Sequence, residues 1–235
     1  MDLSSLTIPG WDYTYLPETG STNDEAFRLG PGHVVAAGRQ TAARGRLGRV
    51  YSAGEGGLWF SVALRPDCAP AQLTPLPALA AVAVREALGD KTMIKWPNDI
   101  FLDGKKICGI LSELRDGVVV LGIGINLTNA LPPELTEAGR AQADAGELLL
   151  AIMRGLDDIL AGFPANADSL MPRYSQHCLT LGKYVDCVYR GMPLHGFACG
   201  VDNSGGLMVM TQESRTVVIL YSGEATLSLP DEDED

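Results

Sequence analysis

The sequence has few histidines and no closely spaced cysteines. Its three histidines lie at no metal-ligand spacing from another His or Cys, and its five cysteines form no C-x-x-C pair. Zinc sites and Cys-His catalysis need such spacings, so both are disfavoured. An odd, scattered set of cysteines is typical of reduced thiols rather than of a disulfide framework.

Long apolar runs and an excess of positive charge are also missing. No apolar run approaches the ~18–20 residues that span a bilayer, and the first ten residues lack the basic and apolar regions of a signal peptide. The net charge is −11, and the last five residues, Asp231 to Asp235, carry −5 of it. Such a chain repels polyanions. We therefore expect a cytoplasmic protein that binds neither nucleic acid nor membranes, with a solvated acidic end.

The composition is that of a folded chain with a sizeable core. The 235 residues are 46% hydrophobic and 20% charged, which suits a compact domain with a small second unit. Periodicity and turn signals predict, in chain order, a strand over 11–16, a helix from Thr22 with a T-x-x-E capping box, strands over 33–37 and 58–64, and a helix over 75–88. They then predict a β-meander over 93–126 with Asp-Gly turns at 103–104 and 116–117, followed by an amphipathic helix within 139–163.

The pattern changes near Cys178. After it, short strands broken by glycines predict a small all-β unit. We therefore divide the chain into a catalytic domain over 1–178, a small β-barrel over 179–229 and an acidic tail over 230–235.

A basic loop contrasts with the acidic chain. The eleven residues from Arg39 to Arg49 contain four arginines, two glycines and no acid. Glycines let the backbone curl around a ligand, and guanidinium groups match phosphate or carboxylate oxygens two at a time. A small-anion site is the favoured interpretation, ahead of a solvated loop and an RNA-binding stretch. Because there is no GxxxxGK[ST] run, any nucleotide is not held by a P-loop.

Other segments have both a structural and a functional interpretation. Lys106 begins an apolar strand, where a cation needs an anionic partner unless it reaches water at the strand end. Two glycines in Gly122–Asn126 weaken a strand unless another group approaches its backbone closely. Lys95–Asp99 is a turn beside a core tryptophan or part of a site. Ser21–Asn23 is a helix cap or a site for polar ligand atoms.

Together, these segments resemble the ordered motif set of biotin–protein ligases. The motifs in chain order are GSTN (20–23), QT (40–41), RGRLGR (44–49), KWPND (95–99), KICGIL (106–111) and GIGIN (122–126). Three later segments, 196–202, 206–207 and 222–227, resemble the small C-terminal barrel of that family. The chain departs from the family at Ala43, where Gly is usual, and at Tyr51, where Trp is usual.

The resemblance implies a fold and a reaction. The fold is α+β, a mixed sheet flanked by helices like that of class II aminoacyl-tRNA synthetases, followed by an SH3-like barrel. ATP, accompanied by Mg²⁺, activates biotin as biotinyl-5′-AMP, and the biotinyl group passes to a lysine of a biotin carboxyl carrier protein. Because only twenty residues precede Ser21, we expect the monofunctional type without an N-terminal DNA-binding domain. Exposed sheet edges leave room for a homodimer.

The resemblance also implies site residues. Lys106 and Arg46 are expected to be catalytic. The expected biotin contacts are Ser21, Thr22, Asn23, Gln40, Arg44, Arg46, Lys106 and Gly109, and the expected ATP contacts are Arg44, Arg46, Arg49, Tyr51, Lys95, Asn98, Lys106 and Asn126. No metal ligand and no general base is assigned. A lipoate-type ligase and a non-enzymatic biotin sensor are the alternatives.

Overall fold

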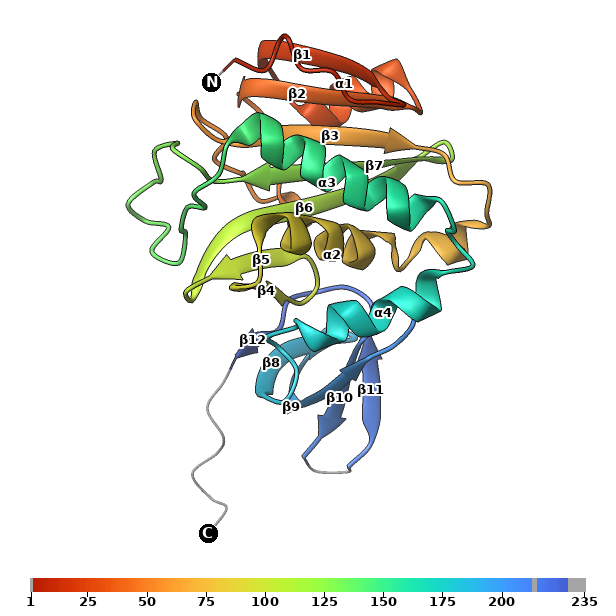
Figure 1. Ribbon diagram of the computed structural model, residues 1–235. Helices are drawn as coiled ribbons and strands as arrows, with labels where there is room; N and C mark the ends of the chain where they lie inside the picture. Colours follow the sequence, from red (N-terminus) through yellow and green to blue (C-terminus); the bar gives the residue numbers. More distant parts are fainter. Residues whose placement is uncertain (1, 213–214, 228–235) are drawn as a thin grey trace.

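Two sheets of unequal size are present in the computed structural model, which describes residues 2–212 and 215–227 (Figure 1). From edge to edge, the larger sheet contains β1 (Asp12–Thr19), β2 (His33–Gln40), β3 (Leu58–Leu64), β7 (Val118–Ile125), β6 (Lys105–Arg115), β5 (Asp99–Leu102) and β4 (Thr92–Lys95). The smaller contains β11 (Val217–Leu220), β10 (Leu207–Thr211), β9 (Met192–Val201), β8 (Tyr184–Tyr189) and β12 (Thr226–Leu227).

The larger sheet is mixed. Only β1 and β2 among its described strands run parallel, and the other neighbouring pairs are antiparallel. The smaller sheet is antiparallel throughout its described strands, which is consistent with an SH3-like unit. The expected α+β fold is confirmed.

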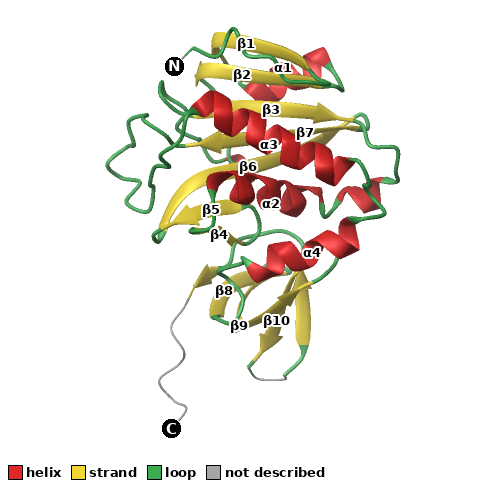
Figure 2. Ribbon diagram, viewed as in Figure 1, coloured by secondary structure: helices red, strands yellow, loops and turns green. Residues whose placement is uncertain are grey.

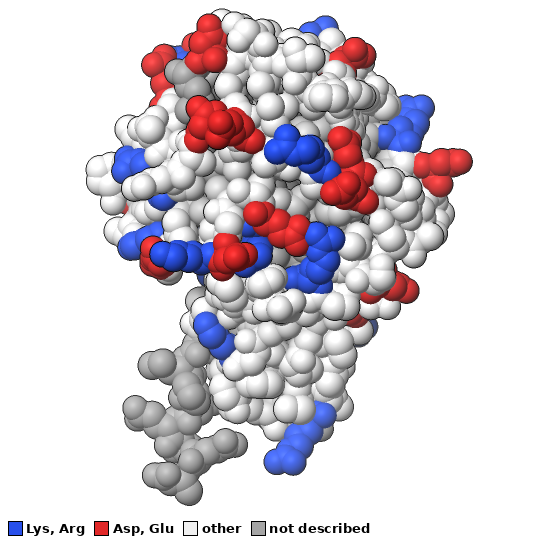
Figure 3. Space-filling view, in the orientation of Figure 1, with Lys and Arg blue, Asp and Glu red and all other residues white. Residues whose placement is uncertain are grey.

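Helices cover both faces of the large sheet. Two helices, α2 (Leu76–Leu88) and α3 (Ala145–Leu160), lie side by side across one face (Figure 2), and α1 (Thr22–Leu29) packs on the other. Alternate residues of β2 point to opposite faces: Val34 joins the main core with α2 and α3, and Val35 joins a smaller cluster with α1. On the face covered by α2 and α3, acidic and basic side chains are interspersed (Figure 3).

Both predicted Asp-Gly turns form. Asp103 and Gly104 have φ values of 49° and 75°, and Asp116 and Gly117 have 50° and 75°. A type I′ hairpin turn requires positive φ at both central residues, which Asp and Gly tolerate. These turns fix the register of β5, β6 and β7, and hence which side chains face the cavity described below.

Other local predictions differ from the structure. The capping box at Thr22 is wrong: the N-cap is Ser21, which makes no side-chain cap bond, and the Thr22 side chain instead bonds to Gln40. The helix within 139–163 begins only at Ala145, where Asp144 caps it. A further helix, α4 (Ala167–Gln176), was not predicted, because an internal proline interrupts its pattern.

The junction between the two sheets lies near the predicted boundary. Cys178 forms an isolated parallel bridge with Ile94 at the outer edge of β4, and β8 begins shortly afterwards. The boundary between 178 and 179 stays a prediction, and the predicted acidic tail over 230–235 lies outside the described residues. Within residues 2–212 and 215–227, no helix is long and apolar enough to cross a membrane.

Candidate active site

A cavity of about 650 Å³ opens where β6 and β7 face the basic loop. It is lined by every predicted biotin or ATP contact except Asn98, namely Ser21, Thr22, Asn23, Gln40, Arg44, Arg46, Arg49, Tyr51, Lys95, Lys106, Gly109 and Asn126. The cavity is also lined by three residues at the start of β12 and just before it, namely Glu224, Ala225 and Thr226. The sequence motifs, spread over more than a hundred residues, therefore meet at one site.

One end of the cavity is polar and buried. Gln40 Oε1 accepts hydrogen bonds from the Thr22 backbone N–H at 2.7 Å and from the Thr22 hydroxyl at 3.0 Å. Ser61 Oγ lies 2.7 Å from Thr22 Oγ1 and 2.6 Å from Asn23 Oδ1. Ser61 was not predicted as a site residue, although it is the lone polar residue of the strand LWFSVAL. The polar groups at this end are therefore hydrogen-bonded to one another, as buried polar groups usually are.

Tyr51 explains why glycines occur in two of the motifs. Its ring lies against Gly109 and Gly124, its hydroxyl donates to the Gly124 carbonyl at 3.1 Å, and it meets Trp59 edge-on with centroids 5.9 Å apart. A Cβ on Gly124 would lie 3.0 Å from the Tyr51 ring. Burial raises the pKa of the Tyr51 hydroxyl. Tyr51 therefore acts as a neutral apolar wall that needs glycine beneath it.

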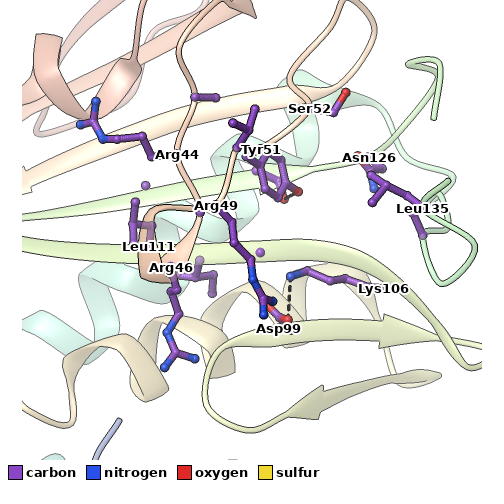
Figure 4. Close-up of a pocket in the computed structure, with 18 of the residues that line it drawn as sticks. Arg44, Arg46, Arg49, Tyr51, Ser52, Asp99, Lys106, Leu111, Asn126 and Leu135 are labelled. Carbon is purple, nitrogen blue, oxygen red and sulfur yellow. Dashed lines mark hydrogen bonds and ion pairs between the residues drawn. The ribbon is translucent and has the colours of Figure 1, made fainter. Parts of the chain in front are cut away.

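Lys106 has the anionic partner that its apolar strand requires. Its Nζ lies 2.6 Å from Oδ2 of Asp99 on the neighbouring strand β5 (Figure 4). Both side chains are about one-third exposed, at 34% and 29%. Asp99 was not predicted as a site residue, and the signal for it was its place in the KWPND motif together with the charge of Lys106. The cavity wall therefore contains a lysine ammonium whose charge is neutralised by the neighbouring Asp99 carboxylate.

Arg44 is bound on the other side of the cavity. Its guanidinium makes a two-pronged contact with Asp24, at 2.7 and 2.8 Å, and a longer contact with Glu113 at 3.5 Å. The hydrogen bond from Arg44 lowers the pKa of Asp24, and the same bond raises the pKa of Arg44. Arg44 extends away from Lys106 (Figure 4). The structure therefore does not bring these two cations together.

The other loop arginines contact the C-terminal part of the chain. Arg46 donates to the Gly223 carbonyl at 2.6 Å and to Asn98 Oδ1 at 3.4 Å, and Arg49 donates to Glu224 at 2.8 Å. Burial lowers the pKa of Arg46. Asn98 is buried and does not line the cavity, but its side chain accepts this hydrogen bond from Arg46. The loop is thus attached to the segment that leads into β12.

The remaining predicted ATP contacts lie in the cavity wall. Lys95 Nζ is 5.5 Å from the centroid of the Phe101 ring. Asn126 is buried, and its Oδ1 accepts a hydrogen bond from Asn129 at 3.1 Å. Among the described residues, no group of three or more His, Cys, Asp or Glu side chains is placed to hold a metal ion.

Known proteins are similar to this chain in both sequence and fold. The model of the Biotin/lipoate A/B protein ligase family matches residues 17–128. The chain is 36% identical to the bifunctional ligase/repressor BirA of Bacillus subtilis, over 94% of this chain and 75% of that protein. It is 31% identical to the biotin–[acetyl-CoA-carboxylase] ligase of Mycobacterium tuberculosis, over 89% of this chain and 87% of that protein. The chain belongs to the biotin protein ligase family.

A solved structure of this family extends the likeness beyond the matched motifs. The biotin protein ligase from Aquifex aeolicus in complex with biotin and ATP superimposes with a TM-score of 0.82 at 29% identity, over 92% of this chain and 98% of that chain. Because this coverage includes both sheets, the small antiparallel sheet belongs to the shared family fold.

Proposed function

We propose that this chain activates biotin with ATP and transfers the biotinyl group to a lysine of a carrier protein. The observation that carries the proposal is the cavity, in which the buried polar end, the arginine loop and the Lys106–Asp99 pair surround one space. The relatives named above are biotin ligases, which favours biotin over lipoate as the substrate.

The polar end of the cavity is the proposed site for the ureido ring. Gln40 Oε1 is committed to Thr22, so Gln40 offers its amide N–H groups to a ligand in the cavity. The Tyr51 wall and the strand at Gly109 supply apolar surface for the sulfur-containing ring and the chain. A mostly apolar pocket with a few convergent polar groups is typical of such ligands. The biotin carboxylate then points toward Lys106.

The first step joins two anions. A carboxylate oxygen of biotin bonds to the α-phosphorus of ATP, the bond from that phosphorus to the bridging oxygen breaks, and pyrophosphate leaves. We assign Lys106 the role of bridging carboxylate and phosphate oxygens, with Arg46 beside the phosphate. Each cation exchanges a protein acceptor, Asp99 or the Gly223 carbonyl, for a ligand oxygen. Preorganised cations of this kind commonly contribute on the order of 10²–10³ in rate.

Mg²⁺ enters this scheme with the nucleotide. A magnesium ion bound to triphosphate oxygens needs only one or two protein carboxylates, and none of the described residues is assigned to it. It would neutralise the phosphate charge that the arginine loop also contacts. The steps assigned to Lys106 and Arg46 do not depend on which carboxylate approaches the ion.

In the second step an amine of the acceptor attacks the biotinyl carbonyl, and AMP leaves. We propose as acceptor the carrier protein of a biotin-dependent carboxylase, because relatives from M. tuberculosis and Paracoccus denitrificans are named biotin–[acetyl-CoA-carboxylase] ligases. No general base is assigned. A homodimer and a cytoplasmic location stay predictions.

The test is biotin-dependent exchange of labelled pyrophosphate into ATP. The ligase performs this exchange with biotin and not with lipoate. A biotin sensor binds biotin without exchange, and a lipoate-type ligase shows the reverse preference. An RNA-binding module shows no exchange with either biotin or lipoate. Absence of biotin-dependent exchange in the purified chain with Mg²⁺ would refute the proposal.

A further inference from the structure

The strand that carries Lys106 has an irregularity next to this residue. Cys108 of β6 pairs with Ile100 of β5. The next pair is Lys106 with Phe101, so β6 has one residue more than β5 between the two pairs. The additional residue is Ile107, which is buried in the main core. An extra residue of this kind is a β-bulge, and bulges often redirect a side chain near a functional site.

The bulge determines which face of the strand Lys106 occupies. Gly109 and Leu111 line the cavity, and side chains of a regular strand alternate between its two faces. Without interruption, this alternation would point Ile107 into the cavity and Lys106 to the opposite face. With the extra residue, Ile107 lies in the core and Lys106 lines the cavity. The position of the ammonium therefore depends on the bulge.

A segment of the loop after β7 pairs with the bulged end of β6. Strand β7 pairs with β6 only from Cys108 onward, and Lys106 forms an isolated parallel bridge with Ala138. The Lys106 N–H donates to the Glu137 carbonyl at 2.7 Å, and the Gly139 N–H donates to the Lys106 carbonyl at 2.8 Å. These two bonds hold the Lys106 backbone on the side that β7 leaves unpaired.

Gly139 lets this segment lie close to β6. Its φ is not positive, so glycine is required here by space rather than by backbone conformation. A Cβ on Gly139 would lie 2.6 Å from the Cβ of Lys105, which is the fixed end of that side chain and cannot rotate away. Carbon atoms in contact lie about 3.5–4.0 Å apart. A larger residue would therefore displace the segment or the start of β6 by about 1 Å.

We propose that Gly139 is a positioning residue for Lys106. By letting residues 137–139 pair with the bulged end of β6, it fixes the Lys106 backbone and so places the ammonium beside Asp99 in the cavity. Gly139 does not itself line the cavity, so it acts through Lys106. Because Lys106 is assigned to the reacting oxygens, this role rests on the proposed function.

The first test measures biotin-dependent pyrophosphate exchange by Gly139→Ala. A misplacement of about 1 Å can cost on the order of 10² in rate, so kcat should fall by about 10- to 100-fold. In a Lys106→Ala background the same substitution should cause no further loss, because the ammonium through which it acts is gone. A normal kcat in folded Gly139→Ala protein would overturn the proposal, as would losses that multiply in the double variant.

Two other double variants show whether contact with Lys105 is the cause. Lys105→Gly removes the Cβ that the new side chain would meet, so it should restore most of the kcat lost in Gly139→Ala. Lys105→Ala retains that Cβ and should not restore it. Equal rates in the two double variants would contradict the proposal. The control for tight packing alone is Gly155→Ala on α3, whose Cβ would lie 3.2 Å from that of Ala83, and it should leave kcat unchanged.

A variant without an added Cβ decides if Gly139→Ala does not fold. Arg140 Nε donates to the Asn129 carbonyl at 2.8 Å and so closes the base of the loop. Arg140→Ala should loosen the segment and lower kcat, again with no further loss in the Lys106→Ala background. An unchanged kcat in Arg140→Ala would then overturn the proposal.

Lysine labelling separates this proposal from the proposed function. Acetic anhydride is added without substrates, and mass spectrometry gives the acetylation rate of Lys106 relative to that of the exposed Lys91. Gly139→Ala should speed acetylation of Lys106, because the ammonium is no longer held against Asp99. If the unchanged protein shows no exchange, the proposed function fails, and labelling still decides the placement of Lys106. If exchange occurs and Gly139→Ala changes neither kcat nor labelling, only the role of Gly139 fails.

Discussion

Asp99 holds Lys106 at 2.6 Å across two neighbouring strands of the cavity wall. Because Lys106 is the cation assigned to the reacting oxygens, Lys106→Ala should lower biotin-dependent pyrophosphate exchange by about 10²–10³. The melting temperature should change little, since the lysine is one-third exposed. The matched control is Lys105→Ala, which removes an exposed neighbour bonded to the Thr136 carbonyl. Near-normal exchange by Lys106→Ala would remove Lys106 from the mechanism.

Arg46→Gly should leave adenylate formation detectable but let the adenylate escape. Arg46 belongs to the loop that closes one side of the cavity and contacts Gly223. A mixed anhydride is lost to water when its site stays open. The measurement is the fraction of labelled biotinyl-5′-AMP that remains with the protein after rapid gel filtration. Arg39→Ala, at a surface pair with Glu18, is the control. Equal retention by Arg46→Gly and the unchanged protein would contradict this role.

The tip of the basic loop should become more protected when substrates bind. Leu47 is 72% exposed and Val50 is 92% exposed, although the loop is closed by a backbone hydrogen bond from the Gly45 N–H to the Arg49 carbonyl. Contacts from its arginines to phosphate would order this tip. We expect amide hydrogen exchange over 41–51 to slow with biotin and ATP together. Rates that are the same with and without substrates would exclude ordering by ligand.

The paired carboxylates Asp24 and Glu113 should make the protein less stable in acid. Both have pKa values below their ordinary values of 3.8 and 4.5. A group with a lowered pKa in the folded state stabilises that state above its unfolded pKa, and this stabilisation is lost as the pH falls through the folded pKa. Denaturant unfolding from about pH 6 to about pH 3 should show a fall in the free energy of unfolding that Glu113→Gln makes shallower. Identical slopes in the two proteins would show that Glu113 is not linked to folding.

The ion pair between Arg49 and Glu224 should contribute little to stability. The two side chains are 65% and 44% exposed, and exposed pairs typically contribute ~0.2–1 kcal/mol. A double-mutant cycle with Arg49→Ala and Glu224→Ala should therefore give a coupling energy of less than about 1 kcal/mol that decreases with added salt. A coupling well above this value would mean that the loop and the C-terminal segment are joined more strongly than their exposure indicates.

Local patterns were sufficient for the elements whose signals are local. The run LWFSVAL predicted β3 to the residue, because a strand that is buried on both faces has a nearly continuous apolar sequence. The Asp-Gly turns were predicted because few residues tolerate positive φ. The Thr22 capping box failed for the opposite reason: Gln40, eighteen residues away, takes the Thr22 side chain. Nothing in the local pattern indicates such a partner.

The site was predictable as a set of residues but not as a set of contacts. The motifs supplied the lining residues, and the cavity contains nearly all of them. The partners of the cations depend on tertiary structure, since Arg49 meets a glutamate 175 residues away and Arg44 meets one on β6. Charge alone predicted that Lys106 needs an anion, and strand pairing was required to identify it as Asp99.

Trp96, in the KWPND motif, limits which module from another protein could replace the small sheet. Its indole N–H donates to the Gly205 carbonyl at 2.9 Å, and its backbone N–H donates to the Thr180 hydroxyl at 3.0 Å. A transplanted module from another protein would have to supply acceptors at both points. Otherwise two hydrogen-bond donors would lack acceptors at the junction between the two sheets, one residue from Lys95 and three from Asp99.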